Sequence, residues 1–158
     1  PFRGGPFNRH EQRLSHFRLA HRDGQVRRNP ELLTAAGLAE FGHKVVGTDK
    51  DLDKISKISQ GIVPFYEPGL DDLLASNLKK GNIVFSADLD KTISESDVIF
   101  VCVGTPQHDD GSADMSQIEE VSRQIAKNLN RYKLVVEKST VPVKTSFWIK
   151  RTICTALC

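Results

Sequence analysis

The stretch DVIFVCVG, residues 97–104, limits the choice of fold more than any other part of the chain. It places six consecutive apolar residues between an aspartate and a glycine. A strand with one face in water alternates apolar and polar residues, whereas a strand that is buried on both faces does not. The run therefore predicts a strand inside a parallel sheet that is covered by helices on both sides.

From residue 30 onward, strand-like segments alternate with segments whose apolar residues have helical spacing. Ile118, Val121 and Ile125, for example, recur at the spacing of one helix face. This alternation is typical of an α/β fold with a doubly wound, mostly parallel sheet. Strands are expected at 43–49, 82–86, 97–104 and 133–139, and helices at 30–41, 50–60, 70–79, 88–96, 116–129 and 143–153.

Charge is divided unevenly along the 158 residues, a length that suits one domain. Residues 1–31 contain seven arginines, no lysine and three acidic residues, whereas residues 32–158 contain seventeen acidic residues against fifteen basic ones. A basic arm can bind nucleic acid. The abrupt change at residue 31 instead favours an arm that is disordered or unrelated to a domain at 32–158, so nucleic acid is not the expected partner.

The cysteines indicate a reduced setting. Cys102, Cys154 and Cys158 are odd in number and lack the spacing of a zinc site, so we expect no metal and a cytoplasmic location. Cys102 lies inside the apolar run and is interpreted as a core thiol. No apolar stretch approaches the roughly 20 residues that a membrane helix needs, so no membrane partner is expected.

Asp49 is the first candidate binding residue. It ends the second expected strand, eighteen residues after Glu31. In dinucleotide-binding folds an acidic residue at such a place accepts hydrogen bonds from the adenosine ribose and repels a 2′-phosphate, which favours NAD over NADP. A surface or turn aspartate explains the position equally well, and both interpretations stay open.

Two loops that follow expected strands are further candidates. The first contains Gly104 and Thr105 after the apolar run, and the second contains Ser139 and Thr140 before Pro142. Open α/β sheets bind ligands at the carboxyl ends of their strands, so two such loops on neighbouring strands would form one crevice. Either loop taken alone is a common connection, and the two together are better evidence for a site than either one.

Four segments carry a resemblance to a known family. They are LLTAAGLAEFGHKVVGTDKD, GIVPFYEPGLDDLL, SDVIFVCVGTPQHDDGSADMS and LVVEKSTVPV. In this order, from about residue 32 to 153, they resemble the N-terminal, Rossmann-like domain of the UDP-glucose/GDP-mannose dehydrogenase family. The DGSAD segment is closer to the UDP-glucose branch. The EKSTVP segment disfavours a hydroxyacid dehydrogenase.

The resemblance implies an NAD-dependent, two-step oxidation of UDP-glucose to UDP-glucuronate, with homo-oligomers in the complete family enzyme. Asp49 and Lys54 would hold the adenosine ribose, and Thr140 would position a water near the reacting centre. The loop 66–69 would follow the second helix. The implied cofactor-binding residues are Asp49, Lys54, Val103, Gly104, Thr105, Pro106, Gln107 and Ser139.

The sequence departs from the family at two places. The three glycines of the family's phosphate-binding turn fall in register on Val26, Arg28 and Glu31, and the family's nucleophilic cysteine and its sugar-nucleotide domain would lie beyond Cys158. We therefore expect a sheet that lacks its first strand and glycine-rich turn. The stretch RLSHFRLA could substitute weakly for that strand, but Arg13, His16 and Arg18 make it a poor buried strand. The chain would then be an incomplete, inactive NAD-binding portion. The alternative is a non-catalytic module that binds a nucleotide or a partner.

Overall fold

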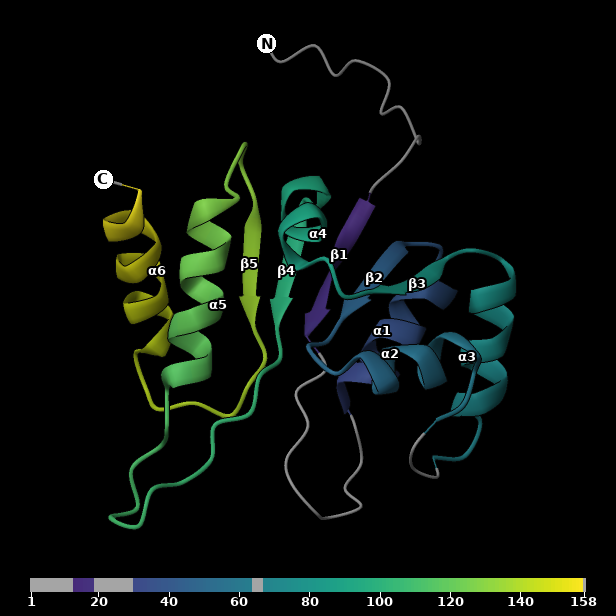
Figure 1. The fold of residues 1–158 in the computed structure, drawn as a ribbon, viewed down its shortest axis with the longest axis horizontal. Coiled ribbons are helices and arrows are strands. Elements are labelled where there is room, and N and C mark those ends of the chain that lie inside the picture. Colours follow the sequence, from purple (N-terminus) through teal and green to yellow (C-terminus); the bar gives the residue numbers. More distant parts are fainter. Residues whose placement is uncertain (1–12, 19–29, 64–66, 158) are drawn as a thin grey trace, which may run out of the picture.

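The computed structural model describes residues 13–18, 30–63 and 67–157, and for 13–18 it describes the backbone. Its core is a single parallel sheet of five strands in the order β3-β2-β1-β4-β5 (Figure 1). The strands are β1 (Arg13–Arg18), β2 (Lys44–Thr48), β3 (Ile83–Ser86), β4 (Val98–Val101) and β5 (Leu134–Glu137). The expected doubly wound α/β fold is confirmed.

The first strand is present, so the expectation that the sheet lacks it is wrong, and the segment that forms it is RLSHFR, the stretch considered as a weak substitute. β1 occupies the centre of the sheet, where Phe17 is in register with Gly47 of β2 and with Phe100 of β4. Without β1, each of these two neighbouring strands would have a row of unpaired N–H and C=O groups. Backbone pairing needs no particular side chain, so the composition of this segment did not exclude it. The division of the chain at residue 31 stays a prediction, since 1–12 and 19–29 lie outside the described residues.

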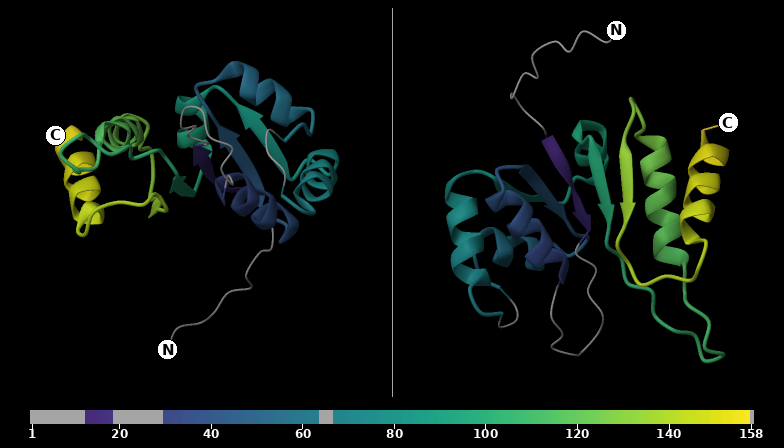
Figure 2. Two further views of the ribbon diagram at one scale, coloured as in Figure 1. Left: turned by 90° about the horizontal axis from the view of Figure 1, so that it is seen from below. Right: turned by 180° about the vertical axis from the view of Figure 1, so that it is seen from behind.

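Helices cover both faces of the sheet, and Figure 2 shows α5 and α6 together on one side of the molecule and α1 and α3 on the other. No helix in the described part of the chain combines the length and apolar content that a membrane span requires. The helices are α1 (Pro30–Glu40), α2 (Leu52–Ser59), α3 (Leu70–Lys79), α4 (Leu89–Glu95), α5 (Ser116–Lys127) and α6 (Thr145–Ala156).

The apolar run contributes to two separate cores. Ile99 and Val101 pack into one core with Ile118 of α5, whereas Cys102 packs into the other with Leu32 of α1. Alternate side chains of a strand point to opposite faces of its sheet, so a strand between two helical layers needs apolar residues at every position. This placement confirms the burial on both faces that the sequence predicts.

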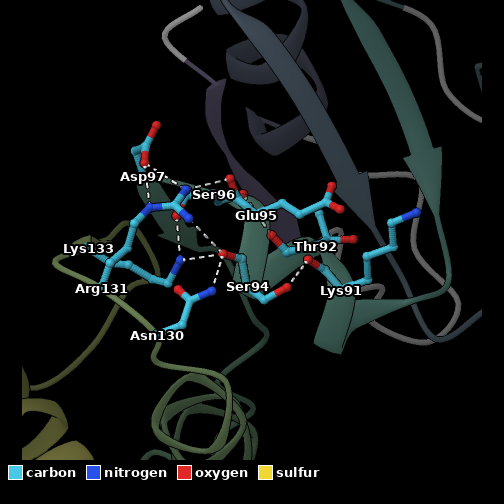
Figure 3. A network of polar contacts seen from close by, with 9 residues as sticks. All are labelled: Lys91, Thr92, Ser94, Glu95, Ser96, Asp97, Asn130, Arg131 and Lys133. Atoms are coloured by element: carbon cyan, nitrogen blue, oxygen red, sulfur yellow. Dashed lines mark hydrogen bonds and ion pairs between the residues drawn. The ribbon is translucent and has the colours of Figure 1, made fainter.

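A polar network holds the amino-terminal edge of β4 and β5 (Figure 3). The Nζ of Lys133 donates hydrogen bonds to the carbonyls of Ser94 at 2.9 Å and Ser96 at 2.7 Å, where α4 ends. Arg131 donates from Nη2 to Asp97 Oδ1 at 2.8 Å. The network supplies donors for the terminal carbonyls of α4, which have no partner inside the helix. It fixes the sheet at the edge opposite to the candidate site.

Candidate functional site

The candidate residues lie along one edge of the sheet. Asp49 follows the carboxyl end of β2, Gly104 lies in the connection after β4, and Ser139 lies in the connection after β5. Because all five strands are parallel, these connections leave the sheet at the same edge, at the bottom of Figure 1. The sheet order changes direction at β1 and β4, and such a switch point is where open α/β sheets bind ligands.

Asp49 forms a buried ion pair with Lys54. The Nζ of Lys54 lies 2.6 Å from Asp49 Oδ2, and the two side chains are only 8% and 10% exposed. The other oxygen of Asp49 accepts the N–H of Asp51 at 3.1 Å. The family resemblance implies that these two residues hold the same ligand, and the structure brings them together. Each carboxylate oxygen has a second lone pair, so Asp49 can still accept a hydrogen bond from a ligand hydroxyl.

The start of α2 positions this pair. The side chain of Asp51 caps the helix and accepts the N–H groups of Asp53 at 3.0 Å and Lys54 at 3.1 Å. An aspartate at this position supplies the acceptor that the first turn of a helix lacks. The cap therefore fixes the backbone of Lys54 directly after the carboxyl end of β2.

Two hydrogen bonds join the connections after β4 and β5. Ser139 Oγ accepts the N–H of Val103 at 2.9 Å, and Thr105 Oγ1 donates to the carbonyl of Thr140 at 2.7 Å. Val103 is buried, Ser139 is half-buried and Thr140 is exposed. The structure thus brings together the two loops that the sequence predicts as one crevice.

The two remaining residues of the predicted set differ in setting. Pro106 is half-buried, and its carbonyl accepts the N–H of Asp114 at 2.7 Å. Gln107 is exposed, and its Nε2 donates to the carbonyl of Gly111 at 3.0 Å. The side chain of Gln107 therefore closes the turn beyond the site, while its role at a cofactor stays a prediction.

Sequence reasoning overlooked Gln117. A Cβ placed on Gly104 would lie 3.7 Å from Nε2 of Gln117, so this amide lies directly against the glycine of the loop. Its position in the first turn of the helix after the Gly-Thr-Pro loop is the signal that could have identified it. The amide can donate and accept, which makes Gln117 a further candidate for contact with a ligand.

Glu137 is a second overlooked residue. Its Oε1 accepts the N–H of Ser139 at 2.5 Å, and its Oε2 is buried without a hydrogen-bond partner in the described part of the chain. Burial raises the pKa of this carboxyl, and the hydrogen bonds from Ser139 oppose the rise. The residue therefore orients the backbone of the loop that carries Ser139.

The buried thiol of Cys102 is not available as a nucleophile. Burial raises its pKa to about 12, and the negative charge of Glu31 adds to the rise. Since the thiolate is the reactive form, this setting makes the sulfur inert, and the interpretation as a core thiol is confirmed. Across residues 30–63 and 67–157, no three His, Cys, Asp or Glu side chains gather closely enough to hold a metal ion.

Known proteins match this arrangement. The model of the NAD-binding domain of the UDP-glucose/GDP-mannose dehydrogenase family matches residues 31–157. A UDP-glucose 6-dehydrogenase of Rhizobium meliloti is 46% identical over 123 residues, which are 77% of this chain and 28% of that protein. One from Bacillus subtilis is 43% identical over 73% of this chain and 26% of its own length. The chain thus spans little more than a quarter of these relatives.

Solved structures agree with the sequence matches. A UDP-glucose dehydrogenase from Pyrobaculum islandicum superposes with a TM-score of 0.81 at 30% identity, over 97% of this chain and 35% of that one. A GDP-mannose dehydrogenase from Pseudomonas aeruginosa gives 0.75 at 35% identity, over 80% and 30%. The chain belongs to the UDP-glucose/GDP-mannose dehydrogenase family, and the part of the family that it matches is the NAD-binding domain.

Proposed function

We propose that this chain is the cofactor-binding portion of a cytoplasmic dehydrogenase that oxidises UDP-glucose to UDP-glucuronate, and that it binds NAD weakly and has no activity by itself. The observation that carries the proposal is the shared edge of Asp49, Gly104 and Ser139. These three positions follow three parallel strands at the switch point of the sheet. The family match supports NAD as the ligand of that edge.

The groups at this edge suit the two ends of a dinucleotide. The carboxylate of Asp49, held by Lys54, accepts hydrogen bonds from the adenosine ribose, while its charge disfavours a 2′-phosphate. Gly104 has no Cβ, so the loop after β4 lets a ligand approach its backbone closely. On the neighbouring loop, the family resemblance implies that Ser139 would contact the cofactor and that the hydroxyl of Thr140 would orient a water near the sugar.

Bound NAD supplies a hydride acceptor for the primary alcohol of the sugar. The residues of this chain would bind and orient it, and neither cysteine in the described part of the chain is placed to act as a nucleophile for the second oxidation. Cys102 is buried and protonated. Cys154 lies near the end of α6, which runs away from the carboxyl edge (Figure 1).

An acidic residue in the first turn of α1 is the reason that we expect NAD to bind weakly. In dinucleotide folds the pyrophosphate lies against the amino terminus of this helix, where the helix dipole and free N–H groups attract an anion. Here Glu31 stands in the first turn of α1. Its carboxylate repels the pyrophosphate, and in family register it replaces the third glycine of the phosphate-binding turn.

Thermal unfolding with and without NAD tests the proposal. We expect NAD at a hundred times its dissociation constant to stabilise the chain by about 2.7 kcal/mol. We expect NAD to shift the unfolding temperature of Asp49→Asn less than that of the wild type, because the variant lacks the charge that accepts the ribose hydroxyls. The shift is measured against the NAD-free value of the same variant, since the substitution also breaks the buried pair with Lys54. If millimolar NAD leaves the unfolding temperature unchanged, the cofactor proposal is wrong for this chain, and a non-catalytic module becomes the better explanation.

A further inference from the structure

An ion pair crosses the candidate site from β2 to α5. The Nζ of Lys50 lies 2.5 Å from Oε1 of Glu120. Lys50 directly follows Asp49, whereas Glu120 lies in the second turn of α5, beyond the Gly-Thr-Pro loop. The pair therefore joins the loop that receives the adenosine ribose to the helix on the other side of the switch point.

The pair of Lys50 and Glu120 is one of two lysine–carboxylate pairs near the carboxyl end of β2. Two lysines follow β2, Lys50 in the loop and Lys54 in the first turn of α2. Each lies against a carboxylate: Lys54 against Asp49 at 2.6 Å, and Lys50 against Glu120. The first pair is buried and comes from adjacent segments. The second pair is partly exposed and depends on a residue that is 70 positions away. Only the second pair can therefore be broken without disturbing the loop itself.

We propose that Glu120 strengthens the preference for NAD over NADP, by holding Lys50 away from the place where NADP would carry its 2′-phosphate. The inference rests on the proposed function. A 2′-phosphate carries nearly two negative charges, and a basic residue close to the ribose is what admits NADP to such a site. Lys50 is next to the ribose-binding Asp49 and has the required charge. Glu120 neutralises it and adds its own repulsion.

The expected effect is modest because the pair is accessible to water. The side chains of Lys50 and Glu120 are 63% and 44% exposed. Exposed ion pairs are worth at most about 1 kcal/mol, so releasing Lys50 should raise the affinity for NADP relative to that for NAD by about three- to fivefold. The change should shrink at high salt, because ions screen exposed charges.

Binding of NAD and NADP to three variants tests the inference. Glu120→Gln releases Lys50, and we expect the ratio of the NADP to the NAD dissociation constant to fall about three- to fivefold. Glu119→Gln is the matched control: Glu119 is paired with Arg123 within α5 at 2.8 Å, and that pair has the same exposures of 63% and 44%. The double variant Lys50→Gln/Glu120→Gln should return the ratio to the wild-type value, since it frees no cation.

The outcomes separate this inference from the proposed function. If NAD binds but Glu120→Gln and Glu119→Gln give the same ratio, the specificity role is wrong and cofactor binding stands. If the double variant keeps the altered ratio, Lys50 is not the responsible cation and the inference is again wrong. If neither dinucleotide binds to the wild-type chain, the proposed function fails and the inference fails with it. Far-UV circular dichroism verifies that each variant is folded.

Discussion

The hydroxyl oxygen of Ser139 accepts the backbone N–H of Val103 at 2.9 Å, and this hydrogen bond links the loop after β5 to the loop after β4. Val103 is only 5% exposed, so water does not replace this acceptor readily. The hydroxyl thus has a structural task besides any contact with a cofactor. The two tasks can be separated by substitution.

Replacing Ser139 with alanine should destabilise the fold by about 1–3 kcal/mol, because it leaves a buried N–H without a partner. Ser139→Thr, which keeps the hydroxyl, should recover most of the loss. Urea denaturation measures both effects, with Ser146→Ala at an exposed position of α6 as the control. Equal stability of the alanine variant and the wild type would show that this hydrogen bond does not hold the loops.

Breaking the buried pair of Asp49 and Lys54 should cost considerably more. Lys54→Met leaves the carboxylate buried without its cation, and loss of one partner of a buried pair typically costs about 3–5 kcal/mol. Lys80→Met removes an exposed pair with Glu40 and should cost less than about 1 kcal/mol. Chemical denaturation of the two variants gives the comparison. Similar losses in both would mean that the buried pair adds nothing beyond a surface contact.

Glu137 should make stability depend on pH above its ordinary pKa of 4.5. Burial raises the pKa of the folded carboxyl, so the folded chain holds this proton more tightly than the unfolded chain does. The stabilising contribution is complete below pH 4.5 and is lost as the pH rises through the folded pKa. Glu137→Gln should therefore be more stable than wild type at pH 7, with a gap that closes toward pH 4. A gap that stays constant between these values in urea titrations would contradict the assignment.

Lys133 should control the end of α4. Lys133→Met leaves the carbonyls of Ser94 and Ser96 without this donor, so we expect a loss of about 1–3 kcal/mol and faster amide exchange in the last turn of the helix. Lys127→Met, which removes an exposed pair between α5 and Asp90, is the control and should leave that exchange unchanged. Hydrogen exchange measured by mass spectrometry distinguishes a local effect from a global one.

The arrangement of the sheet was largely predictable from local pattern. The apolar run of β4 and the alternation of strands and helices specify a parallel sheet, and the positions of Asp49, Gly104 and Ser139 after their strands then place them at one edge. β1 was identified from the sequence only as a weak substitute, because its arginines and histidine disfavour a buried strand. Its place depends on two neighbouring strands that need a partner, and the composition of Arg13–Arg18 does not reveal that need.

The details of the site were less predictable, because they depend on contacts between distant residues. Lys50 and Glu120 are 70 positions apart, and no spacing rule pairs them. The buried setting of Glu137 likewise appears only when the loops fold over it. The local hydrogen bond of Gln107 to Gly111 was also not predictable from the family resemblance, which implies only a place for Gln107 at the cofactor.

The central place of β1 has a consequence for how the chain acquires its structure. β1 is synthesised before β2 and β4 but lies between them, so the two halves of the sheet can join only after both neighbours have paired with it. Contacts of such long sequence separation form slowly. We therefore expect the pairing of β1 with β2 and β4 to be a late step of folding. Loss of β1 would separate the sheet into two parts, β3-β2 and β4-β5.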